Sequence, residues 1–214
     1  MKTKTFGQLR ERVGQLAASL AAAGVTEGDR VGGYIPNCPE AIEAMAATAS
    51  LGAVWSSTSP DFGVSGVLDR FSQIRPKVVF SVEAVSYNLK THDHLAKLSQ
   101  VVNELDSVER VVVIPFIHEK QNIDLCQIKH SVFLDDFLEL GKNEDGSYPE
   151  LVYKQVPFSH PLFIMYSSGT TGAPKCMVHS VGGTLMKHLE EHQVHYIVQF
   201  DPTGYPIWSE TGVG

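Results

Sequence analysis

The sequence predicts an α/β fold, built as a mostly parallel sheet with flanking helices. Segments with a helical repeat of apolar residues alternate along the chain with short, apolar, extended segments. No internal repeat or low-complexity tract interrupts this alternation. The composition agrees, because 43% of the 214 residues are hydrophobic, which is enough for a sizeable core.

The first expected element is a helix that begins after Thr5. Thr5 and Gln8 fit a capping box, in which each side chain bonds the backbone N–H of the other residue. Apolar residues then recur on one helical face as far as Leu20, and Gly24 is placed to end the helix.

Strands and helices then alternate. The strands are expected at residues 31–35, 53–57, 77–82 and 110–115. The helices are expected near residues 40–51, 64–74 and 95–105. Right-handed crossovers between parallel strands would place these helices on both faces of the sheet. Residues 141–150 are polar and rich in turn formers, and we expect an exposed linker there.

The stretch most informative about function is residues 166–175, Tyr-Ser-Ser-Gly-Thr-Thr-Gly-Ala-Pro-Lys. Hydroxyl groups donate hydrogen bonds, glycines allow backbone N–H groups to approach an anion, and the lysine adds a positive charge. The stretch therefore predicts a loop that binds a polyphosphate. The residues expected to bind the phosphates are Ser167, Ser168, Gly169, Thr170, Thr171, Gly172 and Lys175.

This loop is not the phosphate loop of the G-x-x-x-x-G-K-[ST] pattern. Pro174 stands where that pattern requires its second glycine, and Cys176 stands where it requires serine or threonine. Apolar segments on both sides predict strand, loop and strand, whereas the other pattern leads into a helix. The alternative is a plain turn between two strands, without a ligand.

The block from Ser167 to Lys175 resembles the phosphate-binding signature of adenylate-forming enzymes, which include acyl-CoA synthetases and luciferases. Residues 37–75 and 158–180 resemble the acetoacetate-activating branch of the acyl-CoA synthetases. The resemblance extends from about Thr5 to His195. It implies that residues 1–195 form part of the large N-terminal domain of such an enzyme, and that this domain is incomplete.

The chemistry implied by the resemblance is a two-step conversion of acetoacetate to acetoacetyl-CoA. A carboxylate oxygen attacks the α-phosphorus of ATP, pyrophosphate leaves, and an acyl-adenylate forms; the thiol of coenzyme A then displaces AMP. Mg²⁺ bridges the phosphate oxygens in the first step. The resemblance thus implies ATP, Mg²⁺ and coenzyme A as substrates or cofactors, and acetoacetate as the acid.

A second candidate site comprises Ser59, Pro60 and Asp61. These residues stand where related acetyl-CoA synthetases carry a Phe-Gly-Gly turn that contacts coenzyme A, but they depart from that pattern. The alternative is an ordinary turn that caps the next helix. Trp55, shortly before them, is expected in the core of the sheet.

A competing motif follows the loop, because His188-Leu-Glu-Glu-His192 matches the H-x-x-E-H pattern of inverted zinc peptidases. Two histidines four residues apart can chelate zinc, and Glu191 could polarise a bound water. A third protein ligand is required, and no second helix follows to carry one. The preferred interpretation is a solvated helix face, so a zinc hydrolase is only an alternative function.

Charge and cysteine content exclude some partners. The 17 Lys and Arg against 24 Asp and Glu leave a net charge of −7, which argues against nucleic acid or an acidic membrane surface as a partner. The three cysteines are far apart and form no C-x-x-C pair, which is typical of reduced thiols in the cytosol. We expect neither a signal peptide nor a membrane span.

Residues 196–214 are expected to form a divergent tail. They resemble a later segment of the family, a strand, an Asp-x-x-Gly turn and a second strand, so an internal deletion is the preferred origin and a frame shift the alternative. The family's catalytic lysine and its adenine-pocket residues cannot be placed on this chain. We therefore expect that the chain alone is inactive. The alternative function is a non-catalytic product that binds nucleotide weakly or regulates a full-length enzyme.

Overall fold

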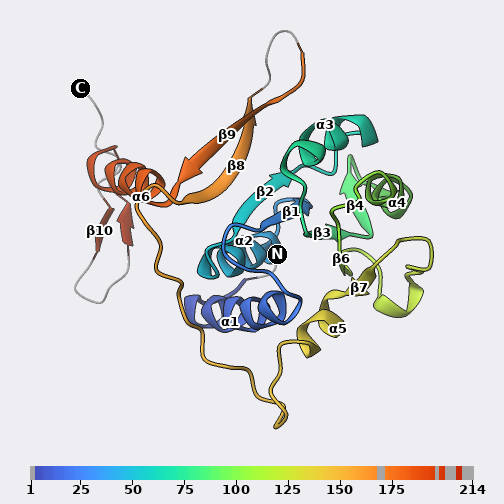
Figure 1. Cartoon of the computed structure of the whole chain (residues 1–214), viewed down its shortest axis with the longest axis horizontal. Coiled ribbons are helices and arrows are strands. Elements are labelled where there is room, and N and C mark those ends of the chain that lie inside the picture. The colour runs from blue at the N-terminus through green and yellow to red at the C-terminus, as the bar shows by residue number, and fades with distance from the viewer. Residues whose placement is uncertain (1–2, 168–171, 196–197, 201–205, 209–214) are drawn as a thin grey trace.

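The computed structural model describes residues 3–167, 172–195, 198–200 and 206–208. The strands of its main sheet are β1 (Arg30–Tyr34), β2 (Val54–Thr58), β3 (Val78–Val82), β6 (Arg110–Ile114), β7 (Ser131–Phe133), β8 (Pro161–Ser167) and β9 (Lys175–Ser180). They are arranged in the order β7-β6-β3-β1-β2-β8-β9 (Figure 1). All neighbouring pairs in this sheet are parallel except β8 and β9, which are antiparallel. The structure thus confirms the predicted fold class.

The helices connect the strands. They are α1 (Phe6–Ala22), α2 (Pro39–Ser50), α3 (Val64–Ile74), α4 (Leu95–Asn103), α5 (Leu134–Glu139) and α6 (Val181–Glu190), with a 3-10 turn at Lys120–Asn122 and a π-helical turn at Glu191–His195. α1 begins as predicted, because the Thr5 side chain accepts the N–H of Gln8 and the Gln8 side chain accepts the N–H of Thr5. Gly24, after its end, has a φ of 83°, in the left-handed region that favours glycine.

Helices cover both faces of the sheet. On one face α1, α2 and α5 pack over a buried cluster that includes Phe80 and Phe137. On the other face α3 and α4 pack over a second cluster that includes Phe71 and Leu98. In β3, Val78, Phe80 and Val82 belong to the first cluster and Val79 belongs to the second, as the two-residue repeat of a strand requires. Trp55 is buried in the first cluster, which confirms its predicted place in the core.

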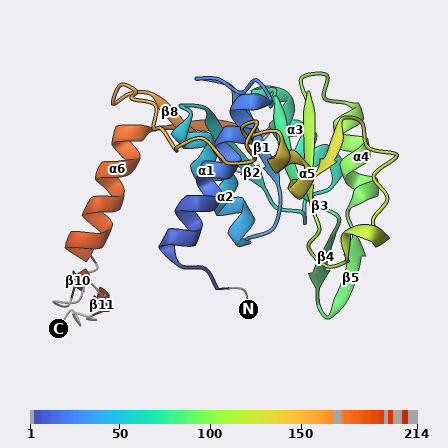
Figure 2. The ribbon, with the colours of Figure 1, turned by 90° about the horizontal axis from the view of Figure 1, so that it is seen from below.

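Two small antiparallel pairs complete the fold. One joins β4 (Ala84–Tyr87) to β5 (Lys90–Asp93), and the other joins β10 (Val198–Phe200) to β11 (Pro206–Trp208). The second pair agrees with the two strands expected in the tail, while the predicted Asp-x-x-Gly turn lies outside the described residues. Figure 2 shows α6 standing away from the rest of the fold, with β10 and β11 beyond its end.

Gly33 of β1 lies in a position where a larger side chain would not fit. A Cβ atom on Gly33 would lie 2.6 Å from Cζ2 of the Trp55 indole and 3.1 Å from Cγ2 of Ile35. Because both neighbours are buried, Gly33→Ala is expected to lower the free energy of unfolding by about 1–3 kcal/mol, measured by urea denaturation. Gly7→Ala, at an open position on α1, is the matched control and should cause no loss. Equal stability of the two variants would contradict this account of Gly33.

Candidate phosphate-binding site

The carboxyl ends of β1, β2 and β8 lie at one edge of the sheet, because these three strands are parallel neighbours. Ligands of open α/β sheets bind outside this edge. The predicted phosphate loop begins where β8 ends, and the predicted coenzyme A residues follow β2. Both candidate segments therefore leave the sheet at the edge where a ligand would bind.

The phosphate loop joins two antiparallel strands, as the sequence predicts. β8 and β9 lie side by side (Figure 1), and Ser167, the last residue of β8, pairs with Lys175, the first residue of β9. Gly172 has a φ of 100°, which strongly favours glycine, and the Lys175 side chain is exposed. The structure thus places these three predicted residues at the two ends of the loop. The other four, Ser168, Gly169, Thr170 and Thr171, lie outside the described residues.

Neighbouring elements fix the strand that leads into the loop. The Tyr166 hydroxyl donates to the backbone carbonyl of Arg70 on α3 over 3.0 Å, and the Ser56 hydroxyl of β2 donates to that of Ile164 over 2.9 Å. Burial raises the pKa of Tyr166 to about 12, so its hydroxyl stays protonated and able to donate. Sequence reasoning did not find these contacts, because they join residues 96 and 108 positions apart.

A hollow of about 320 Å³ contains the second candidate segment. It is lined by residues 35–37 after β1, residues 57–61 at the end of β2 and residues 85–87 of β4. The chain leaves β1 towards β2 but leaves β3 in the opposite direction, towards β6. Such a divergence opens a crevice at the carboxyl ends of the strands. Ser59, Pro60 and Asp61 all line this hollow.

The same three residues also form a locally bonded turn. The Ser59 hydroxyl donates to the Asp61 carboxylate over 3.0 Å, and the Asp61 backbone N–H donates to the Ser59 oxygen over 3.2 Å. The Lys97 ammonium group of α4 donates to the Pro60 carbonyl over 2.9 Å. The turn and part of the lining of the hollow are thus formed by the same residues.

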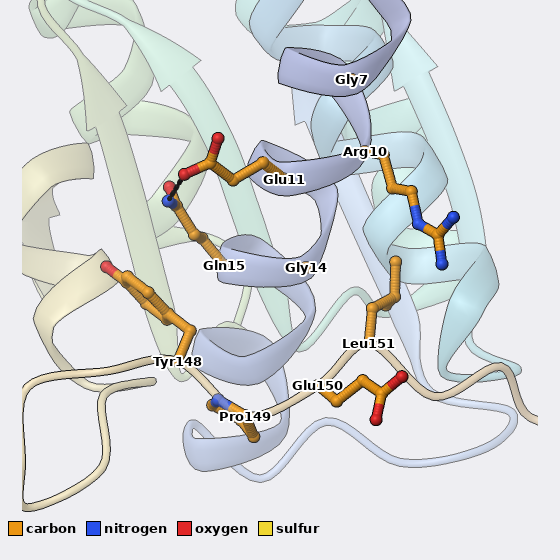
Figure 3. Close-up of a pocket in the computed structure, with 9 residues that line it drawn as sticks. All are labelled: Gly7, Arg10, Glu11, Gly14, Gln15, Tyr148, Pro149, Glu150 and Leu151. Atoms are coloured by element: carbon orange, nitrogen blue, oxygen red, sulfur yellow. Dashed lines mark hydrogen bonds between the residues drawn. The ribbon is translucent and has the colours of Figure 1, made fainter.

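A larger hollow, of about 440 Å³, lies on the outer side of α1, against residues 148–151 (Figure 3). The Gln15 amide donates to Glu11 across this surface over 3.4 Å. Arg10 and Glu150 add one charge of each sign. None of the predicted site residues lines this hollow, and its mixed charges favour no particular anion or cation.

The two histidines of the zinc alternative do lie near each other. The ring centroids of His188 on α6 and His192 on the π-helical turn are 6.4 Å apart. The Glu191 carboxylate, however, is 2.8 Å from the Lys187 ammonium group. Within the described residues, no group of three His, Cys, Asp or Glu side chains is placed to hold a metal ion. The described part of the chain therefore offers the zinc alternative no complete ligand set.

No helix among the described residues combines the length and the apolar content needed to cross a bilayer. The three cysteines, Cys38, Cys126 and Cys176, form no disulfide in the described structure.

A parallel sheet whose carboxyl edge carries a glycine- and hydroxyl-rich loop between two strands defines a class of nucleotide-binding α/β proteins. Residues 1–204 match the family model described as AMP-binding enzyme, and the chain belongs to this family.

The relatives found by sequence and by structure belong to a narrower group within this family. The chain is 57% identical over 212 residues to acetoacetyl-CoA synthetase of Macaca fascicularis, covering 96% of this chain and 31% of that protein. It is 41% identical over 212 residues to acetoacetyl-coenzyme A synthetase of Rhizobium meliloti (strain 1021), with the same coverage of both chains. The solved structure of acetoacetyl-CoA synthetase from Streptomyces lividans superposes with a TM-score of 0.78 at 42% identity. That match covers 87% of this chain and 27% of the other.

The chain therefore spans about a third of the length of the curated relatives that it matches. The described fold corresponds to part of an acetoacetyl-CoA synthetase, which agrees with the resemblance found in the sequence.

Proposed function

We propose that this chain carries the ATP-phosphate-binding part of an acetoacetate–CoA ligase. The observation that carries the proposal is the strand, loop and strand that opens at the carboxyl edge of the sheet, with Ser167 paired to Lys175 across its base. Identity to acetoacetyl-CoA synthetases supports acetoacetate as the acid, and ATP, Mg²⁺ and coenzyme A as the other reactants.

The loop's contribution is electrostatic. When a carboxylate attacks the α-phosphorus, negative charge develops on the leaving pyrophosphate. The Lys175 ammonium group and the hydroxyl and backbone N–H donors of the loop would stabilise that charge. Mg²⁺, bound together with the nucleotide, would supply further positive charge to the phosphates. These groups serve the first half-reaction, the formation of the acyl-adenylate.

The hollow beside Ser59, Pro60 and Asp61 is proposed to contact coenzyme A in the second half-reaction. Its polar lining and its place at the carboxyl edge support this assignment. The negative charge of Asp61 would repel the diphosphate of coenzyme A, so the neutral pantetheine arm is the part that fits. Binding of the arm here would bring the thiol to the edge of the sheet that carries the phosphate loop.

The chain by itself is proposed to bind nucleotide phosphates without completing the ligation, because it spans only 31% of its relative from Macaca fascicularis. The division of the chain at residue 195, with residues 196–214 as a divergent tail, remains a prediction. A cytosolic location fits the unpaired cysteines.

Lys175→Ala is expected to weaken the binding of Mg·ATP by about 10–100-fold, because a charge-assisted hydrogen bond contributes roughly 1.5–3 kcal/mol. The measurement is calorimetric titration of the purified chain with Mg·ATP and with AMP. The affinity for AMP should change less, because AMP lacks the two phosphates that leave as pyrophosphate.

Lys90→Ala, on the exposed strand β5, is the matched control and should bind Mg·ATP as the unmodified chain does. Equal affinities of the two lysine variants would contradict the assigned role of the loop. Pyrophosphate exchange with acetoacetate tests the proposed inactivity, and robust exchange by the chain alone would refute that inactivity.

A further inference from the structure

We propose that Gln73 of α3 is a positioning residue for Lys175, and that it acts by holding the two residues that flank this lysine in the chain. The inference rests on the proposed function of the phosphate loop. Gln73 lies 101 positions before Pro174 and 103 before Cys176, so no local sequence pattern links them.

Both ends of the Gln73 amide are used in this contact. Its Nε2 group donates to the backbone carbonyl of Pro174 over 3.0 Å. Its Oε1 atom accepts a hydrogen bond from the Cys176 thiol over 3.3 Å. The Nε2 group also donates to the Asp69 carbonyl of its own helix over 2.5 Å, which fixes the direction of the amide. One side chain of α3 therefore contacts the residue before Lys175 and the residue after it.

The same helix also contacts the strand that enters the loop. The Tyr166 hydroxyl donates to the Arg70 carbonyl, and the Arg70 guanidinium carbon lies 5.6 Å from the centroid of the Tyr166 ring. Arg70 also stacks on Phe62, at 4.2 Å from that ring centroid. Gln73 follows Arg70 by three positions, so the two residues lie on the same face of the helix. α3 therefore supports the loop at its entrance and at its exit.

Ordered backbone on both sides of Lys175 increases the contribution of this lysine to phosphate binding. Gly172 permits many backbone conformations, and the exposed Lys175 side chain has several rotatable bonds. Each conformation that must be given up when a phosphate binds subtracts from the affinity. A contact that orders residues 174 and 176 beforehand lowers this cost.

Because Gln73 is exposed, its replacement can affect the loop without lowering the stability of the whole fold. Its side chain is exposed on α3, whereas Phe71 and Ile74 of the same helix are buried. Gln73→Met keeps the length of the side chain and removes the hydrogen bonds to Pro174 and Cys176. Gln100→Met, at an exposed position of α4, is the matched control. Neither variant should shift the urea midpoint appreciably.

The first test uses ligand affinity. Gln73→Met is expected to weaken Mg·ATP binding by about 3–10-fold and to leave AMP binding unchanged, while Gln100→Met changes neither. In a chain that already carries Lys175→Ala, Gln73→Met should have no further effect, because Gln73 acts through that lysine. A full additional loss in the double variant would overturn the positioning role.

The second test needs no ligand, so it does not depend on the proposed function. Amide hydrogen exchange at residues 175–178 should be faster in Gln73→Met than in Gln100→Met or the unmodified chain. Equal exchange in all three chains would overturn the inference. If the unmodified chain fails to bind Mg·ATP, the proposed function is wrong, and with it the positioning role. If the chain binds Mg·ATP but both glutamine variants bind equally well, only the role of Gln73 is wrong.

Discussion

Replacing Glu83 with glutamine is expected to lower the free energy of unfolding by about 3–5 kcal/mol, because a buried carboxylate that accepts several hydrogen bonds is costly to replace. Glu83 follows β3 and is 2% exposed. One of its oxygens accepts the backbone N–H groups of Ile117 and His118, and the other accepts that of Phe116, each over 2.7 Å. Glutamine would turn an N–H donor towards at least one of these N–H groups. The segment after β6 would then lose part of its attachment to residue 83.

Urea denaturation of Glu83→Gln and of the control Glu119→Gln measures this effect. Glu119 is exposed and lies next to the same segment, so its replacement should cost less than about 0.5 kcal/mol. Similar losses in the two variants would show that the three N–H contacts contribute little.

The pH dependence supplies a second readout for Glu83. Burial raises the pKa of Glu83, but the backbone N–H groups of His118, Phe116 and Ile117 outweigh it and hold the pKa below its ordinary value. The contribution of this carboxylate is therefore present above its ordinary pKa and is lost as the pH falls through its lowered value. Glu83→Gln should lack that part of the acid transition.

Much of the fold could be predicted because its signals are local. The capping box of Thr5 and Gln8 marks the start of α1, and the apolar run at residues 78–82 marks a strand buried on both faces. The hairpin of β4 and β5 gave no such signal. Its turn places Asn88 and Leu89 at φ values of 49° and 60°, where a glycine would ordinarily follow the asparagine. β7 and α5 were missed because three and six residues are too few for a repeat to show.

The candidate site also has a part that local sequence predicts and a part that depends on distant residues. The phosphate loop is a continuous run of residues, so its composition predicted its place, and the apolar segments beside it predicted the two strands. The groups that support it are far apart in the sequence, as Gln73 and Pro174 are, and they meet only because α3 packs beside β8 and β9. The hollow at Ser59 likewise depends on β4, which follows β3 in the chain, and β3 is the neighbour of β1 in the sheet.

Acidification from pH 6.5 to about 4 is expected to remove about 3 kcal/mol of stability through His94 alone, since each unit of pKa shift corresponds to about 1.4 kcal/mol. His94 precedes α4 and is fully buried, with its ring centroid 4.2 Å from that of Tyr34. Neither ring nitrogen has a hydrogen-bond partner among the described residues. Burial, and then the charge of Lys97, lower the pKa of His94 from 6.5 to about 4, although Asp93 opposes this.

The sign follows from the protons bound by each state. Between pH 6.5 and about 4, the unfolded chain binds a proton at His94 that the folded chain does not. Stability therefore falls as the pH falls through this window, and it is unaffected by His94 above it. Glu83 contributes mainly at lower pH, because its pKa is held below its ordinary value, whereas the loss through His94 begins near pH 6.5.

His94→Phe isolates the effect, because phenylalanine has a similar ring and no group that titrates. At pH 7 this variant should be as stable as the unmodified chain or more stable, since it removes two buried nitrogens without partners. Between pH 6.5 and 4, the stability of this variant should fall by about 3 kcal/mol less than that of the unmodified chain. His92→Phe, on exposed β5, is the matched control and should retain the full acid dependence. If His94→Phe loses stability as steeply as the control in urea titrations across this range, the buried imidazole is not the group responsible.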